Sequence, residues 1–316
     1  MAVGRSTVVG AIVASLVSAF AWATYYLFVL WVTPGTAPSA ILAYPFLLGG
    51  AAYAGWAVAT GHGRAFLRVW AEPMAYVRVA LLFGMQITVL AATYLAGPVD
   101  ASLLSLIGDV VLTPIVVAGM IAIYRTHILT PLFAVGLLVS LAGGTMAIVG
   151  GQSLSAIHGW GWLAVPGVPL TVAFYFILTA RANRTAPPSA VVSQSMLGAG
   201  VFVVLFAPAI PGGWGGLVSV APMPLFLLAL CGVTSFFLAP VVYFLAIEEV
   251  GFVIPPMLMT AIPVFTLLLS ASVLHIALPV IGILGIPVAV AGAVLALRGE
   301  SSFPPETGPE PLPPTA

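Results

Sequence analysis

The chain has 316 residues, of which 62% are hydrophobic and only 5% are charged, and its formal net charge is zero. A water-soluble chain of this length needs several times more charge to cover its surface, and the absence of a basic tract excludes nucleic acid as a partner. This composition is typical of an integral membrane protein that crosses the bilayer several times.

Ten long apolar stretches follow one another along the chain, and we expect each to be a transmembrane helix. A helix needs about 20 apolar residues to cross a hydrocarbon core of roughly 30 Å. The predicted fold class is therefore all-α integral membrane, with short connections and no extramembrane domain. The predicted spans are residues 8–32, 39–60, 79–96, 101–124, 129–149, 160–180, 189–209, 222–247, 250–274 and 278–297.

The basic residues indicate how these helices are oriented. All of them are arginines, and with a cytoplasmic N-terminus each falls in or beside a cytoplasmic segment: Arg5, Arg64, Arg68, Arg78, Arg125, Arg181, Arg184 and Arg298. Because arginine and lysine are enriched in cytoplasmic loops, we predict location in the cytoplasmic membrane with both termini inside the cell. A cleavable signal peptide is the alternative for the first span, since Arg5 precedes a small-residue pattern at Ala19 and Ala21, but the apolar run is long for one.

The two halves of the chain resemble each other. A shift of 150 positions superimposes Tyr25 on Tyr175, and a shift of 149 superimposes Gly49 on Gly198, Tyr94 on Tyr243, Asp100 on Glu249, Pro114 on Pro263, Gly136 on Gly285 and Gly143 on Gly292. Five spans in each unit, an odd number, invert the second unit in the membrane, as in many transporters. We predict two inverted five-helix repeats, residues 1–156 and 157–298, followed by a proline-rich, disordered cytoplasmic tail, residues 299–316.

The stretch from Tyr94 to Gly143 combines an acidic residue at a helix turn, Asp100, a mid-helix proline, Pro114, and two glycines seven positions apart. The second half repeats this pattern. The chain thus resembles the ten-helix drug/metabolite transporter superfamily, in its EamA-type branch, and Trp22 resembles a tryptophan in the first helix of that family. The resemblance implies transport of a small solute, and peripheral fifth and tenth helices that support assembly, which leaves a homodimer open.

Asp109 is the only acidic residue well inside a predicted span. It lies eight residues beyond the start of the fourth span, about 12 Å along a helix that rises roughly 1.5 Å per residue, and hence near the bilayer centre. A carboxylate at that depth usually marks an ion or substrate path, and Ser105 lies on the same helix face. We expect Asp109 to take part in proton coupling or to bind a cationic group. The alternative is a structural carboxyl group that is hydrogen-bonded to neighbouring helices.

Several other side chains within the spans are candidates for contact with a solute. Beside Asp109 and Ser105, the substrate-binding candidates are Trp22, Tyr25, Gln86, Tyr175, Gln194 and Met257. The alternative for each is a bridge between two helices or an anchor at the membrane surface. Pro114 and Pro263 are the hinge candidates, because proline removes a backbone hydrogen bond from its helix.

These features favour a secondary transporter that moves a small organic metabolite or drug-like solute by alternating access. The chain has no lysine and therefore no Walker-type nucleotide site. Because Cys231 is alone and the histidines fall at predicted helix ends, we expect no metal, no cofactor and no enzyme activity. The expected partners are the solute and the lipid bilayer. A channel or a non-transporting scaffold is the main alternative, and a membrane-embedded enzyme is a weaker one.

Overall fold

The computed structural model describes residues 5–96, 130–149, 164–250, 255, 258–273, 275 and 280–300, and in this part of the chain every regular element is helical. Nine of the ten predicted spans have helices among these residues, whereas the fourth, 101–124, lies outside them. The α-helices are α1 (Arg5–Val32), α2 (Pro38–Ala59), α3 (Gly63–Trp70), α4 (Pro73–Ala96), α6 (Pro131–Val149), α7 (Ala164–Ala182), α8 (Pro188–Leu205), α9 (Gly213–Val218), α10 (Pro222–Cys231), α11 (Ala239–Val250), α13 (Ile262–Val273) and α14 (Val280–Glu300). Between them lie the 3₁₀ turns η3 (Ala207–Ala209) and η5 (Met259–Ala261) and the π-helical segment η4 (Gly232–Leu238).

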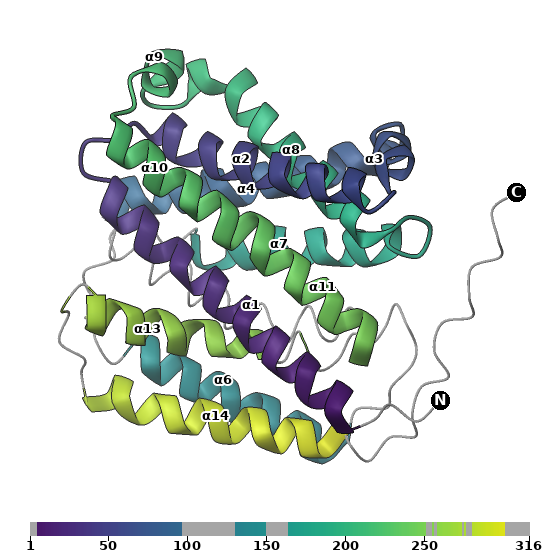
Figure 1. The fold of residues 1–316 in the computed structure, drawn as a ribbon. Coiled ribbons are helices and arrows are strands. Elements are labelled where there is room, and N and C mark those ends of the chain that lie inside the picture. Colours follow the sequence, from purple (N-terminus) through teal and green to yellow (C-terminus); the bar gives the residue numbers. More distant parts are fainter. Residues whose placement is uncertain are drawn as a thin grey trace, which may run out of the picture.

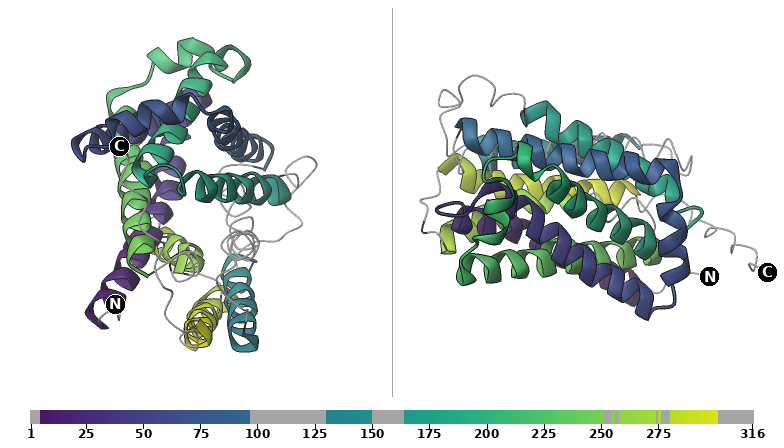
Figure 2. Two further views of the ribbon diagram at one scale, coloured as in Figure 1. Left: turned by 90° about the vertical axis from the view of Figure 1, so that its right-hand side faces the viewer. Right: turned by 90° about the horizontal axis from the view of Figure 1, so that it is seen from above.

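The long helices run side by side along one direction (Figures 1 and 2). Figure 1 shows α6, α13 and α14 together at the lower side and α2, α4 and α8 at the upper side, with α1, α7 and α11 between them. The start of α1, helix α3, the loop after α7 and the end of α14 lie at one end of the bundle, and α9 lies at the other. This arrangement places the described arginine-bearing connections at one end, as the predicted orientation requires.

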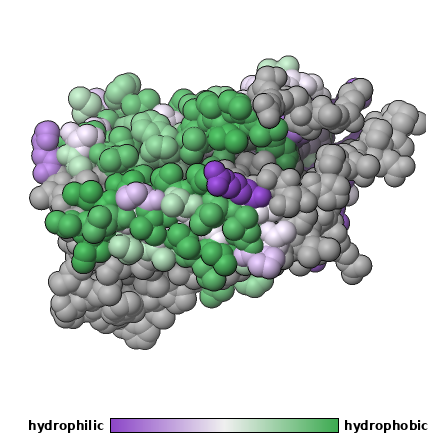
Figure 3. Space-filling view, turned by 90° about the horizontal axis from the view of Figure 1, so that it is seen from below, coloured by the Kyte–Doolittle hydropathy of each residue, from purple (hydrophilic) through white to green (hydrophobic). Residues whose placement is uncertain are grey.

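Apolar side chains cover the outside of the bundle as well as its interior. Four helical segments are long and apolar enough to cross a membrane: Val8–Val29, Pro38–Ala59, Pro188–Leu205 and Pro222–Val250. The face of the molecule in Figure 3 is mostly hydrophobic where it is coloured. Leu138 of α6 and Val280 and Leu284 of α14 are each more than half exposed. Such large exposed apolar surfaces are stable when lipid covers them. The protein is therefore a multi-pass membrane protein.

Proline begins several of the long helices, because its missing N–H costs nothing in the first turn, where N–H groups have no partner within the helix. This effect corrects one expected boundary. We expected the third span to start at residue 79, but α4 begins at Pro73. Arg78, which we expected to flank a connection, therefore lies inside the helix and is buried, with 1% of its surface exposed.

Helices α10 and α11 form one long helix with η4 in its middle. Pro240 has no N–H for the carbonyl group four residues earlier, and its ring would clash with that carbonyl in a regular α-helix. The turns that precede Pro240 are accordingly wider, in the π-helical form. Sequence reasoning predicted the span but not this local widening.

Helices α6 and α14 are in close contact through glycines, and the contact repeats itself. A Cβ atom added to Gly143 would lie 2.1 Å from the backbone nitrogen of Ala289. One added to Gly292 would lie 2.1 Å from the backbone nitrogen of Ser140. Gly292 and Ala289 lie 149 positions after Gly143 and Ser140, so each contact is the image of the other. Residue numbers rise along one helix as they fall along the other, and the two helices are therefore antiparallel.

The contact between α2 and α8 shows the same relation with a shift of 150. A Cβ atom at Gly50 would lie 2.6 Å from the nitrogen of Leu197, and one at Gly200 would lie 2.9 Å from the nitrogen of Leu47. These helices are also antiparallel, and they begin 150 positions apart, whereas α6 and α14 begin 149 apart. The shift of 149 that we applied to Gly49 is therefore wrong by one position in α2 and α8.

Candidate functional site

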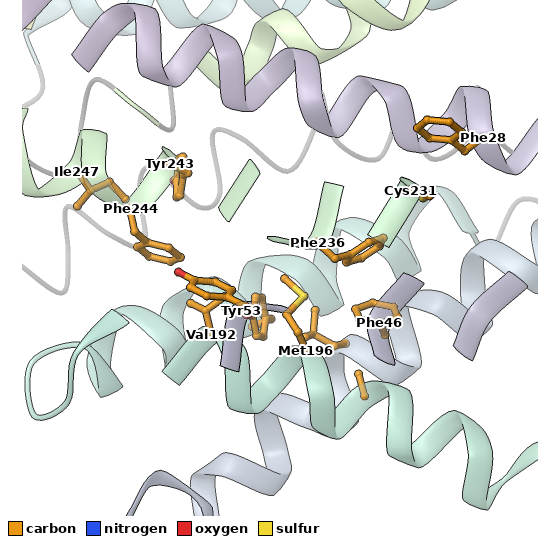
Figure 4. Close-up of a cluster of buried hydrophobic side chains, with 13 residues drawn as sticks. Phe28, Phe46, Tyr53, Val192, Met196, Cys231, Phe236, Tyr243, Phe244 and Ile247 are labelled. Atoms are coloured by element: carbon orange, nitrogen blue, oxygen red, sulfur yellow. The ribbon is translucent and has the colours of Figure 1, made fainter. Parts of the chain in front are cut away.

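A buried cluster rich in aromatic side chains lies where α1, α2, α4, α7, α8 and α10–α11 meet (Figure 4). Its members come from both halves of the chain, so this cluster forms part of the contact between them. Its buried aromatic members are Phe28, Phe46, Tyr53, Tyr175, Phe236, Tyr243 and Phe244, and Met196 packs among them. Polar groups placed within such a cluster are costly unless they are paired, and they are therefore the features of interest.

The first of these groups is a hydrogen bond between two residues proposed from the sequence. The Tyr25 hydroxyl of α1 donates to Gln86 Oε1 of α4 at 3.0 Å. Gln86 is 2% exposed, while Tyr25 is only partly buried and rests edge-on against Phe236. The pair joins two helices of the first half and lies against a ring from the second half.

Trp22 extends this contact between the halves. Its ring meets the ring of Tyr243 at 61° with the centroids 5.4 Å apart, and the centroid of the Phe176 ring lies 6.2 Å from that of Tyr243. Trp22 remains partly exposed, while Tyr243 is buried. Of the residues proposed as solute contacts, Trp22 and Tyr25 thus lie on one helix, three positions apart, and face the same aromatic cluster.

Hydroxyl groups hold α1 against the π-helical segment. Ser235 donates to the carbonyl of Ala21 at 2.9 Å, and Ser18 donates to the carbonyl of Ala239 at 2.8 Å. Thr24 also lies 3.3 Å from the hydroxyl of Thr234. These side chains bond to or beside a widened turn, and such π-helical turns are frequently found at functional sites.

Arg78 forms the centre of a second polar group, on α4, α7 and α8. Its Nη2 atom donates to Gln194 Oε1 at 3.5 Å, and its Nη1 atom lies 4.0 Å from Glu72 Oε2. Ser195 also donates to Gln194 Oε1, at 3.2 Å. Arg78, Gln194 and Ser195 are all buried, while Glu72 is 41% exposed.

Tyr175, another proposed solute contact, belongs to this second group. It lies on α7 near Arg78, Thr179 and Ser195. Among the described residues, four buried polar atoms of the group have no hydrogen-bond partner: Arg78 Nε, Tyr175 Oη, Thr179 Oγ1 and Gln194 Nε2. We name Arg78, Tyr175, Thr179, Gln194 and Ser195 the Arg78 cluster.

Sequence reasoning missed Arg78, although the sequence contains the signal. A helix that begins at Pro73 places Arg78, Leu82 and Gln86 at intervals of four, on one face. All three are buried. The positive charge of Arg78 by itself indicates a connection, whereas Pro73 indicates that the helix has already begun.

The remaining proposed residues divide into two sets. Asp109, Ser105, Met257 and Pro114 lie outside the described residues, as does most of the C-terminal tail. Pro263 is the second residue of α13, and α13 begins directly after the 3₁₀ turn η5. In the described part of the chain, no three His, Cys, Asp or Glu side chains are placed to hold a metal ion.

Comparison with known proteins agrees with the helical architecture. A solved structure described as "Crystal structure of protein" has a TM-score of 0.71 and 21% sequence identity, and the match covers 92% of this chain and 98% of that one. At this identity the likeness shows the fold alone. Among curated proteins none matches this sequence. Residues 159–298 match the model of the EamA-like transporter family. This match over the second half supports the resemblance of the chain to the EamA-type branch of the drug/metabolite transporter superfamily.

Proposed function

We propose that the protein is a secondary transporter that moves a small organic solute across the cytoplasmic membrane by alternating access. The observation that carries this proposal is the pair of repeated glycine contacts, in which equivalent helices of the two halves lie antiparallel. Such an inverted relation allows one packing arrangement to exist in two mirrored versions, one open to each side of the membrane.

The contacts between the halves support the same conclusion. Trp22 and Tyr25 of the first half lie against Tyr243 and Phe236 of the second, beside the buried amide of Gln86. Binding sites for small molecules are mostly apolar and aromatic, with a few polar groups that fix orientation. The aromatic cluster has this composition at the place where inverted-repeat transporters bind their substrates.

Asp109 is the residue that we propose for proton coupling. A carboxylic acid near the bilayer centre changes charge when it binds a proton, and the cost of burying that charge ties protonation to conformation. The support for this role is the position of Asp109, eight residues beyond the start of the fourth predicted span.

Solute counterflow in proteoliposomes tests the transport function. A thermal-shift screen of the purified protein against a metabolite library would first supply a ligand. Vesicles loaded with that unlabelled ligand should then accumulate the labelled form transiently and saturably, because a carrier exchanges one solute for another. A channel would give unsaturable equilibration without counterflow, and a scaffold would give no flux; either result would contradict the proposal.

A further inference from the structure

Arg78 is a buried cation whose neighbours use only part of its hydrogen-bonding capacity. A guanidinium group has five N–H donors, yet its two contacts among the described residues are long, at 3.5 Å to Gln194 and 4.0 Å to Glu72. Charge-assisted hydrogen bonds of this type are usually about 2.7–2.9 Å. The third nitrogen, Nε, has no partner there. A buried charge that is so weakly paired is costly and is retained mainly where it serves a function.

Several polar atoms at and near Arg78 lack a hydrogen-bond acceptor among the described residues. The unpaired atoms are two hydroxyl groups, Tyr175 Oη and Thr179 Oγ1, one amide nitrogen, Gln194 Nε2, and Arg78 Nε itself. All four can donate a hydrogen bond. They come from three helices, α4, α7 and α8, and surround a positive charge. The two hydroxyl groups can also accept a hydrogen bond, but the amide nitrogen and the guanidinium group can only donate. Donors thus outnumber acceptors beside a positive charge, and a ligand that complements them is an anion with several acceptor oxygens.

We propose that the Arg78 cluster binds the carboxylate group of the transported solute. The inference rests on the transport function proposed above and specifies the class of solute. A carboxylate presents two coplanar oxygens that match the guanidinium group. Tyr175 belongs both to this cluster and to the aromatic cluster, so the body of the solute would lie against aromatic rings. Arg78 and Gln86 are about 12 Å apart along α4, at roughly 1.5 Å per residue, which sets the length over which a small solute would extend.

Glu72 provides the structural alternative, in which Arg78 serves only as an ion-pair partner. Its carboxylate is 41% exposed and lies at the outer limit of an ion pair. Exposed pairs of this geometry contribute little. If the proposal is right, Glu72 is a weak substitute for the solute, and its removal leaves carboxylate binding intact.

The test measures binding and thermal unfolding of the full-length protein in detergent. The probes are benzoate and hexanoate, their uncharged amides benzamide and hexanamide, and inorganic phosphate. We expect the carboxylates to bind and to raise the unfolding temperature, and the matched amides to have no effect. Arg78→Met should weaken carboxylate binding roughly tenfold or more, while the unfolding temperature without ligand stays the same or rises. Stabilisation by phosphate alone, or by amides and carboxylates equally, would overturn the proposal.

Two further variants keep the test decisive. Glu72→Gln should retain carboxylate binding, whereas equal losses of stability in Glu72→Gln and Arg78→Met would show an ion pair with a structural role only. Tyr175→Phe removes one unpaired hydroxyl group without changing the shape of the ring. It should weaken carboxylate binding but not unfolding stability, and it replaces Arg78→Met if that variant does not fold. Unchanged binding in Tyr175→Phe and Arg78→Met would refute the site.

Counterflow separates this inference from the transport function. If proteoliposomes exchange uncharged or cationic solutes, and Arg78→Met exchanges them equally well, the protein is a transporter but the carboxylate site is wrong. If no solute of any charge is exchanged, the proposed transport function itself fails. If carboxylates are exchanged and the exchange is lost in Arg78→Met, both stand.

Discussion

The close approach of α6 and α14 predicts that two glycines, Gly143 and Gly292, cannot be replaced by alanine without a loss of stability. In Gly143→Ala, the new methyl carbon would lie 2.1 Å from the nitrogen and 2.6 Å from the Cα atom of Ala289. In Gly292→Ala, the corresponding distances to Ser140 are 2.1 Å and 2.5 Å. The atoms that are met belong to backbone, which cannot rotate away. Each variant must therefore push one helix away from the other.

The magnitude follows from these distances. Two carbon atoms in ordinary van der Waals contact lie about 3.5 Å or more apart. The two helices must therefore separate by roughly 1 Å or more where the new methyl group lies. Overpacking of this kind costs about 1–3 kcal/mol. The helical preference of alanine over glycine returns at most about 1 kcal/mol. We expect each substitution to destabilise the protein by about 2 kcal/mol, which is a fall of roughly 4–8 °C in unfolding temperature.

Thermal unfolding of purified variants in detergent measures the effect, with Gly55→Ala as the matched control. Gly55 lies within α2, and a Cβ atom there would meet nothing within 4 Å, so this variant should unfold at or above the wild-type temperature. The double variant Gly143→Ala/Gly292→Ala should lose less than the sum of the single losses, because the first methyl group already opens the contact for the second. If Gly143→Ala and Gly292→Ala unfold like Gly55→Ala, the described helix contact is wrong.

Three further predictions concern coupling, orientation and the aromatic cluster. Asp109→Asn should abolish uptake driven by a pH gradient while it spares solute exchange, because the amide has the shape of the neutral acid but releases no proton; normal transport in both assays would make Asp109 structural. Reporter fusions after Gly61 and after Gly213 should lie in the cytoplasm and outside the cell, respectively, and reporters on the same side would contradict the orientation. Tyr25→Phe should lose the hydrogen bond to Gln86 at a cost of about 1 kcal/mol and raise the solute concentration at half-maximal counterflow; an unchanged concentration dependence would remove Tyr25 from the site.

The helical spans could be predicted from the sequence because the bilayer imposes one strong requirement. Every backbone group in the hydrocarbon core must be paired within the chain, so a long apolar run is a helix, and all predicted spans that the structure describes are helical. Orientation and inversion remain predictions, since arginine placement and residue matches indicate them only indirectly.

Tertiary contacts and local helix form were harder to predict. Tyr25 and Gln86 were both proposed from the sequence, but their hydrogen bond depends on how α1 and α4 rotate against each other. The burial of Arg78 depends on where α4 begins. Pro73 indicates that start, but the positive charge of Arg78 indicates a connection outside the membrane instead. The π-helical turn before Pro240 changes only the backbone hydrogen-bonding pattern within an apolar run. The apolar composition of that run does not indicate which pattern its backbone adopts.

The contacts between the halves fall into two kinds, and their difference bears on how the protein would change state. In the α2–α8 and α6–α14 pairs, glycines bring backbone against backbone, and an added Cβ atom would lie at 2.1–2.9 Å. In the α1–α11 and α4–α7 pairs, glycines have ordinary room: Cβ atoms at Gly10 and Gly84 would meet Glu249 and Thr171 at 3.9 Å. Closely interlocked backbones resist sliding, while contacts between side chains can be exchanged. A transition between inward-open and outward-open states, as proposed here, therefore disturbs the packing least if the helices move at the α1–α11 and α4–α7 contacts. Those contacts also border the Arg78 cluster and the Tyr25–Gln86 pair, so a solute bound there would touch the surfaces that must move.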